Sequence, residues 1–196
     1  EVDTGLHLML VLRMAARLGA PLPVRWACLM HDLGKGTTPA DVLPRHLGHE
    51  QRSARLLKAV SERLRVPADC HELADVVARE HGNIHRSGAL NAAATLRLLE
   101  RCDALRKPAR FADALLACEC DARGRLGLED AAYPQRPRLQ AALDAALAVP
   151  TAPIAQAALA AGVRGPGVGR RIASAREQAV AQALAAAAPA SAPLAG

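Results

Sequence analysis

The sequence predicts an all-α protein. Hydrophobic residues make up 51% of its 196 positions and aromatic residues only 2%, so Leu, Val and Ala must fill the core. Ala and Leu are strong helix formers. Runs of Val, Ile, Thr and Tyr, which would favour strands, are absent. A chain of this length can bury one substantial core and a smaller appended one.

Three helices are expected in the first third of the chain, over residues 4–18, 24–33 and 49–65. Asp3 or Thr4 can cap the first helix, and a glycine follows both the first and the second. The third helix has apolar residues at intervals of three or four positions, which is the period of one helical face. A loop rich in glycine and proline is expected between the second and the third helix.

Three more helices are expected over residues 67–80, 91–106 and 108–124. A proline opens the first and the last of these three, and proline is favoured in the first turn of a helix. Asn91 can cap the middle one. The stretch HGNIHRSGAL, which lies before Asn91, predicts a loop.

The stretch RGRLGLEDAAYPQRPR interrupts this helical pattern with glycine, proline and charge. Beyond it, further helices are expected over residues 137–148, 153–161 and 167–187. The sequence therefore predicts a main helical unit over residues 1–125, a smaller C-terminal helical region over 126–188, and a tail over 189–196. The tail is of low complexity, and its composition predicts disorder.

The net charge of +6 and the pI of about 9.5 favour an anionic partner. Proteins that bind single-stranded nucleic acid usually stack bases on aromatic rings, but this chain has one Trp, one Tyr and one Phe. Contact with backbone phosphates is therefore the expected mode of binding. The first residue is not Met and a helix follows almost at once, so we expect a piece of a longer polypeptide.

The cysteines form no C-x-x-C pair and lie in helical, largely apolar contexts. They are Cys28, Cys70, Cys102, Cys118 and Cys120. This pattern predicts reduced, buried thiols in a cytoplasmic protein. No apolar run reaches the roughly 18 residues of a membrane span, and no segment is similar to a signal peptide.

Each of the first five expected helices carries at least one side chain that can bind a metal. These are His7, His31 with Asp32, His49, His81 and Asp103. Helical bundles build metal sites from such side chains when they project into a shared core. The adjacent pair His31 and Asp32 ends an apolar run, where a buried carboxylate is costly without a counter-charge. A divalent cation supplies that charge.

The order of His7, His31 with Asp32, and Asp103 resembles the H…HD…D pattern of the HD superfamily, metal-dependent phosphohydrolases with an all-α scaffold. The stretches EVDTGLH, HDLGKGTTP, PRHLGHE, DALRKPAR, ECDARGRLG and YPQ resemble the C-terminal half of the bacterial multifunctional CCA proteins. Those proteins are tRNA nucleotidyltransferases that carry an HD domain. The resemblance covers roughly residues 1–175 and implies an HD-domain helical bundle with a smaller C-terminal helical appendage.

The resemblance implies that His7, His31, Asp32 and Asp103 hold the first ion. It further implies that His49 and His81 hold a second ion or contact the substrate phosphate. Three more side chains remain candidate ligands, namely His46, His85 and, in place of Asp103, Asp121.

Histidine and carboxylate ligands fit Ni, Co, Mn, Fe or Zn better than Mg. Such an ion lowers the pKa of a bound water and neutralises charge on phosphoryl oxygens. Asp32 is the expected catalytic residue that holds the metal and orients the water. Lys35 is expected either to bind a substrate phosphate or to be an ordinary solvated lysine. The implied substrates are 2′-nucleotides, 2′,3′-cyclic nucleotides and simple phosphoesters.

Basic side chains near two helix ends are expected to contact the phosphates of tRNA: Arg106, Lys107, Arg110, Arg123 and Arg125. The nucleotidyltransferase family binds its catalytic Mg²⁺ through an Asp-x-Asp pair, and this sequence contains none. CCA addition therefore cannot be catalysed by these residues alone. Two further hypotheses are a non-catalytic tRNA-binding module and a stand-alone HD nucleotide hydrolase. The expected partners are tRNA, nucleotide phosphoesters and, as an open option, further copies of the chain in a homo-oligomer, with no membrane.

Overall fold

The computed structural model describes residues 3–187. This part of the chain forms nine α-helices and two short 3₁₀ helices and contains no strand, which confirms the all-α prediction. The elements are α1 (Thr4–Arg17), α2 (Leu22–Met30), η1 (Leu33–Thr37), α3 (His49–Leu64), α4 (Ala68–His85), η2 (Arg86–Ala89), α5 (Ala92–Arg101), α6 (Pro108–Arg123), α7 (Gln135–Ala148), α8 (Thr151–Ala160) and α9 (Pro166–Ala186).

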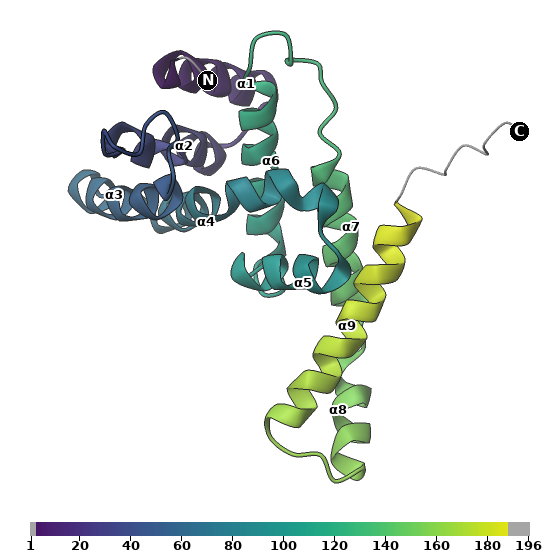
Figure 1. Ribbon diagram of the computed structural model, residues 1–196. Coiled ribbons are helices and arrows are strands. Elements are labelled where there is room, and N and C mark those ends of the chain that lie inside the picture. Colours follow the sequence, from purple (N-terminus) through teal and green to yellow (C-terminus); the bar gives the residue numbers. More distant parts are fainter. Residues whose placement is uncertain (1–2, 188–196) are drawn as a thin grey trace, which may run out of the picture.

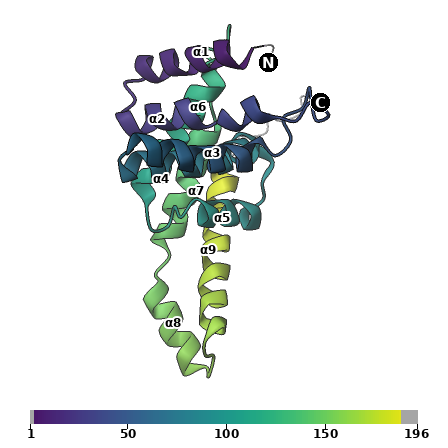
Figure 2. The same ribbon diagram turned by 90° about the vertical axis from the view of Figure 1, so that its left-hand side faces the viewer.

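Helices α1 to α4 form a stack beside α6 (Figures 1 and 2). Within the stack α1 packs on α2, α2 on α4 and α4 on α3, while α6 contacts α1, α2 and α4. Helices that are distant in the sequence therefore meet, and the first helix of the chain lies against the sixth.

The C-terminal helices extend the core of this bundle. Helix α7 packs on α6, and α9 packs on both α5 and α7. The buried core includes Leu57, Leu73, Phe111 and Leu115 from the bundle together with Leu143 from α7. Helix α8 packs on α9, and the two project away from the bundle as a hairpin (Figures 1 and 2). The predicted tail over 189–196 lies outside the described residues.

The predicted helix caps are present. The Asp3 side chain accepts hydrogen bonds from the backbone N–H groups of Gly5 and Leu6, and the Asn91 side chain accepts one from Ala94. All five cysteines are buried and none forms a disulfide. Among the described residues no single helix has the length and apolar composition of a membrane span. Helices α7 and α8 meet that criterion only together, across a 48° bend, by length and composition alone.

Two helix ends differ from the prediction. Helix α4 continues to His85 instead of ending near residue 80, and Gly82 lies inside it. Helix α5 ends at Arg101 instead of continuing to residue 106. It ends because Asp103 adopts a left-handed conformation with φ of 52°, and its N–H bonds to the carbonyl of Glu100. This is the geometry of a Schellman motif, in which glycine is the usual residue.

Candidate metal centre

Six side chains from five helices form two adjacent groups, which together we call the metal centre. The first group contains His7, His31 and Asp121, and the second contains Asp32, His49 and His81. Within each group the ligand atoms lie within 4.8 Å of one another. The six side chains lie at or near the ends of α1, α2, α3, α4 and α6, so the crossing of these helices brings them together.

Each of the four histidines directs its Nδ1 atom to a backbone carbonyl. The acceptors are Gly124 for His7 (3.1 Å), Cys28 for His31 (2.8 Å), His46 for His49 (2.9 Å) and Val77 for His81 (2.9 Å). A carbonyl oxygen only accepts, so Nδ1 must carry the proton in all four rings. In the neutral ring the lone pair is then on Nε2.

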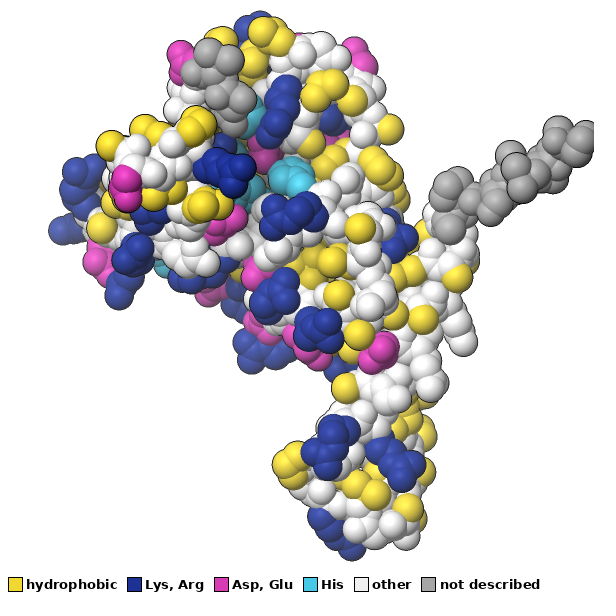
Figure 3. Space-filling model, viewed as in Figure 1, with side chains coloured by type: hydrophobic (Ala, Val, Ile, Leu, Met, Phe, Trp, Pro, Cys, Tyr) yellow, Lys and Arg dark blue, Asp and Glu magenta, His cyan; other side chains and the backbone are white. Residues whose placement is uncertain are grey.

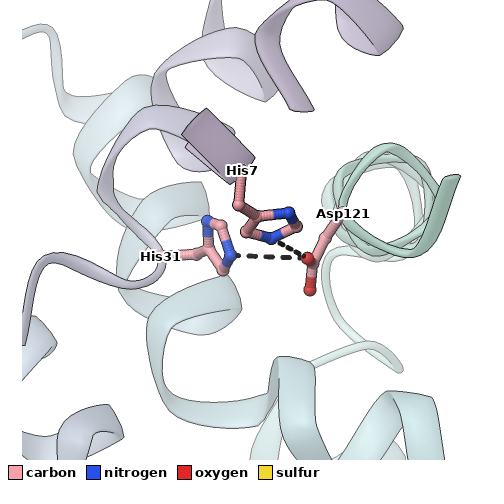
Figure 4. A group of neighbouring side chains, drawn as sticks. All are labelled: His7, His31 and Asp121. Carbon is pink, nitrogen blue, oxygen red and sulfur yellow. Dashed lines mark hydrogen bonds and ion pairs between the residues drawn. The ribbon is translucent and has the colours of Figure 1, made fainter. Parts of the chain in front are cut away.

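The four Nε2 atoms converge on two carboxylates. Figure 4 shows His7 and His31 directed toward Asp121 from two helices. The His7 Nε2 lies 2.8 Å from Asp121 Oδ1, and the His31 Nε2 lies 3.1 Å from Asp32 Oδ2.

The second group has the same arrangement around the other carboxylate. Asp32 Oδ1 lies 3.4 Å from His49 Nε2 and 3.6 Å from His81 Nε2. The two Nε2 atoms of His49 and His81 are 3.3 Å apart. With neutral rings, lone pairs therefore face carboxylate oxygens and also face each other.

This arrangement fits a divalent cation. Two of the converging atoms, His31 Nε2 and Asp32 Oδ1, are buried and make no hydrogen bond of good geometry, although their ion-pair partners lie at 3.1 to 3.7 Å. Buried polar atoms without a partner are rare and costly, and a cation shared among them satisfies them. Histidines that ligate metals typically donate their other ring N–H to a carbonyl or carboxylate, as all four do here. Imidazole and carboxylate donors suit first-row transition metals.

The charges of the metal centre also favour a cation. Burial alone would lower the pKa of His31, but the carboxylates of Asp121 and Asp32 outweigh it and raise that pKa to about 10. Burial together with the positive charge of His31 lowers the pKa of His81 to about 4. The neighbouring histidines hold the pKa of Asp121 well below its usual value despite burial. Two ionised carboxylates thus lie around a buried position that already attracts positive charge.

Comparison with known proteins decides the family. The HD domain model matches residues 4–122, a range that contains all six side chains of the metal centre. The chain belongs to the HD domain family. In this HD domain the adjacent His31 and Asp32 form the doublet that gives the family its name, and each contributes to a different group of the metal centre.

The relatives of this HD domain are longer proteins. A "Multifunctional CCA protein" of Polaromonas naphthalenivorans (strain CJ2) is 70% identical over 187 residues, covering 95% of this chain and 44% of the relative. Proteins of the same name from Acidovorax sp. (strain JS42) and Leptothrix cholodnii are 72% and 63% identical, each over 92% of this chain and 43% of the relative. The chain thus spans less than half the length of these relatives. No solved structure matches it.

The structure corrects one predicted ligand of the HD domain. His7, His31, Asp32, His49 and His81 are brought together, but Asp103 is not among them. Its carboxylate accepts hydrogen bonds from Arg106 Nε and Nη2, at 2.7 and 2.8 Å. Asp103 serves instead as the left-handed residue that ends α5. Asp121 occupies the position in the first group that was expected for Asp103.

The buried stripe of α6 is the signal that identifies Asp121. Ala114, Ala117 and Cys118 are buried, and Asp121 continues their spacing of three and four residues with only 4% exposure. A carboxylate on the apolar face of a helix requires a partner.

The candidate ligands His46 and His85 belong to neither group of the metal centre and lie beside it. The His46 Nδ1 atom is 2.7 Å from the hydroxyl of Thr38, and the His85 Nε2 atom is 2.7 Å from Asp121 Oδ2. His85 therefore contacts Asp121, a side chain of the metal centre, whereas the hydrogen bond of the His46 ring is to Thr38.

Lys35 lies next to the HD doublet. Its Nζ atom is 2.7 Å from Asp32 Oδ2, and its side chain is largely buried. Together with Asp32, His31 and the first turn of α1, it lines a pocket of about 180 Å³. The ammonium group of Lys35 thus lies directly beside a carboxylate of the metal centre, and its predicted phosphate-binding role stays a prediction.

The basic residues between α5 and α6 are engaged within the chain. Arg106 holds Asp103, and Arg110 and Lys107 both hold Glu72. The prediction that these three side chains contact tRNA phosphates stays a prediction, and such contact would require each to share or leave its carboxylate partner.

The basic residues at the end of α6 lie closer to the metal centre. Arg123 bonds to Glu119 and to the carbonyl of Glu129, whereas the half-exposed Arg125 lies 3.8 Å from Asp121 Oδ1. Histidine side chains reach the surface in Figure 3, with Lys and Arg side chains around them. Asp or Glu side chains lie beside the same histidines in this view.

Proposed function

We propose that this HD domain is a metal-dependent phosphohydrolase that acts on 2′,3′-cyclic nucleotides, 2′-nucleotides and simple phosphoesters. We further propose that it belongs to a protein that adds or repairs tRNA 3′ ends. The observation that supports the hydrolase most directly is the convergence of the Nε2 atoms of four histidines on the carboxylates of Asp32 and Asp121. Similarity to the multifunctional CCA proteins supports the tRNA context.

We assign each residue of the metal centre a role in metal binding, phosphate contact or orientation of water. His7, His31 and Asp121 would hold one ion, and Asp32, His49 and His81 would hold the other or, in the case of the two histidines, contact the phosphate. A bound first-row ion lowers the pKa of water and neutralises phosphoryl charge. Asp32, which belongs to the second group and lies beside His31 of the first, would orient the attacking water, and Lys35 would contact a phosphate oxygen from the pocket.

The test measures hydrolysis of 2′,3′-cyclic AMP by the purified protein with Ni²⁺ or Mn²⁺. We expect metal-dependent turnover that Asp32→Ala reduces to the level of the metal ion alone. Asp103→Ala is the matched control, because it removes the same carboxylate outside the metal centre, and it should retain activity. Equal activity of the wild type and Asp32→Ala would refute the proposal.

Backbone contact with tRNA is a second proposed function, supported by a separate surface. A pocket of about 530 Å³ between α1 and the segment after α6 is lined by four arginines, Arg13, Arg17, Arg123 and Arg125. Arginines in a concave surface attract phosphates, and binding of this kind weakens with salt.

This second function is tested by measuring tRNA affinity at several salt concentrations. We expect affinity to fall steeply with salt, to weaken in the double variant Arg13→Ala and Arg125→Ala, and to be unaffected by Asp32→Ala. Arg63→Ala, an exposed arginine on α3, is the control. Affinity that does not respond to salt would exclude phosphate contact by this surface.

A further inference from the structure

The YPQ stretch returns to the metal centre from the segment after α6. The Tyr133 hydroxyl lies 2.9 Å from His85 Nδ1, and the Gln135 side chain donates a hydrogen bond to the backbone carbonyl of His85 at 3.0 Å. The rings of Tyr133 and His85 meet edge to face, with centroids 5.7 Å apart. The stretch therefore contacts both the side chain and the backbone of His85.

His85 in turn contacts a predicted ligand. Its Nε2 atom lies 2.7 Å from Asp121 Oδ2, while Asp121 Oδ1 faces His7. A carboxylate only accepts, so the His85 Nε2 is the donor. In the neutral ring, Nδ1 then accepts a hydrogen bond from the Tyr133 hydroxyl.

This arrangement sets His85 apart from the four histidines of the metal centre. Their Nδ1 atoms face carbonyls, which only accept, so Nδ1 keeps a proton and Nε2 is the nitrogen that can release its proton to a metal. The Nδ1 of His85 instead faces a hydroxyl that can donate to it, so the neutral ring keeps its proton on Nε2. A protonated nitrogen cannot ligate a metal. His85 is therefore suited to orient a ligand and not to act as one.

We propose that His85 and Tyr133 are positioning residues that fix Asp121 for metal binding. A hydrogen bond to Oδ2 restricts rotation of the carboxylate, so that Oδ1 stays directed at His7 and His31. Partners that orient metal ligands typically change metal affinity by about 10- to 100-fold when they are removed. The inference rests on the proposed metal site. Tyr133 lies outside residues 4–122, so one of the two proposed positioning residues comes from beyond the range that the family model matches.

The first test measures the affinity of the purified protein for Ni²⁺ alone, by calorimetry or by competition with a chelator. Tyr133→Phe keeps the ring and removes the hydroxyl, and we expect it to weaken Ni²⁺ binding by about tenfold. The melting temperature of the metal-free protein should change no more than in the control. That control is Ser61→Ala, which removes a hydroxyl 3.0 Å from His71 Nδ1 at the opposite end of α3 and α4.

A second pair of variants separates orientation from ligation. His85→Gln retains an N–H donor and should keep most of the Ni²⁺ affinity, whereas His85→Leu should lose at least as much as Tyr133→Phe. Equal losses in His85→Gln and His85→Leu would identify His85 as a ligand and overturn the proposal.

The outcomes distinguish this inference from the proposed function. If the wild type binds no Ni²⁺, Mn²⁺ or other first-row ion, the proposed function and the positioning role are both refuted. If the wild type binds Ni²⁺ and Tyr133→Phe binds it equally well, the positioning role alone is refuted. If Ser61→Ala weakens binding as much as Tyr133→Phe, the effect is general destabilisation and the positioning role is again refuted.

Discussion

At the scale of single residues, the metal centre uses two ways of orienting its ligands. The Nδ1 atoms of the four histidines are held by backbone carbonyls, so on that side the orientation of each ring depends on the backbone. Asp121 is held by the side chain of His85. Substitutions outside the six ligands should therefore affect Asp121 more readily than the histidines.

The role assigned to Asp121 gives a direct prediction. Asp121→Asn keeps the volume of the side chain but removes its charge, so we expect Ni²⁺ affinity to fall by more than about tenfold. Asp103→Asn is the matched control and should leave the affinity unchanged, because Asp103 pairs with Arg106. Isothermal titration with Ni²⁺ checks both. An equal loss of Ni²⁺ affinity in the two variants would indicate that Asp103 is a metal ligand after all.

Five of the six side chains of the metal centre could be predicted from the sequence, because histidines and the HD doublet stand out in apolar helices. Asp121 could be predicted only as a substitute for Asp103. The resemblance carried by the stretch DALRKPAR favoured Asp103, the wrong aspartate, because the sequence did not reveal that α5 ends at Arg101. The position of an aspartate on a buried stripe proved more informative than the residues adjacent to it.

At the scale of helices, close backbone contact brings the ligands together. A Cβ atom on Gly34 would lie 2.3 Å from the carbonyl oxygen of His49 and 2.5 Å from the nitrogen of Ser53. A Cβ atom on Gly124 would lie 2.6 Å from the Cα of Val11. Both glycines therefore permit an approach between helices that no other residue allows, at the points where Asp32 meets His49 and where α6 meets α1.

This closeness predicts that Gly34→Ala separates η1 from α3. We expect it to destabilise the protein by about 1–3 kcal/mol and to weaken metal binding, because backbone atoms must move apart. Gly36→Ala is the matched control, since a Cβ atom there meets no atom within 4 Å. Thermal unfolding and Ni²⁺ titration of the two variants provide the measurement. Equal stability of the Gly34→Ala and Gly36→Ala variants would show that η1 and α3 can move apart without loss of stability.

The contact between α6 and α7 contains a carboxylate whose charge should stabilise the fold. Burial raises the pKa of Glu119, but Arg136 and Arg123 outweigh it and hold the pKa below the ordinary 4.5. A carboxyl group with a lowered pKa in the folded state stabilises it fully above the unfolded pKa. That stabilisation is lost as the pH falls through the folded pKa.

Glu119→Gln should therefore destabilise the protein by about 1 kcal/mol at neutral pH. The difference from the wild type should shrink as the pH falls below 4.5. Urea unfolding across this pH range measures the effect. Glu100→Gln, on the exposed side of α5, should show no comparable loss at any pH. A difference that does not depend on pH would show that the ion pairs are not its cause.

The helices themselves were largely predictable, but the way in which they end was not. Apolar spacing and caps indicated nine helical segments, and nine are present in the described part of the chain. The stretch around Gly82 was expected to be a loop, yet it continues α4 to His85. Helix packing outweighs the low helix propensity of glycine here, because Ile84 is fully buried in the core.

At the scale of the whole molecule, the C-terminal helices share one core with the HD domain. Leu139, Leu143 and Val180 are fully buried with the bundle residues. Helix α8 and the part of α9 that packs on it, in contrast, extend from the bundle and carry Arg side chains at their end (Figure 3). The family match ends at residue 122, but the buried core extends into α7 and α9.

We therefore expect that a change in α7 destabilises the entire molecule. Leu143→Ala removes a fully buried side chain and should lower the free energy of unfolding by about 2–5 kcal/mol in a single transition. Leu147→Ala, one turn further along α7 and 41% exposed, should cost less than about 1 kcal/mol. Chemical denaturation followed by circular dichroism compares them. Separate transitions for α7 and the bundle would contradict a shared core.

The spread of the ligands along the chain has a consequence for biosynthesis. His7 lies in α1 and Asp121 in the last turn of α6, so one group of ligands is complete only after α6 has been translated and packed against α1. Domains generally fold as units while they emerge from the ribosome. A nascent chain that ends before Asp121 therefore lacks a complete first group. Metal loading should accordingly follow completion of the bundle.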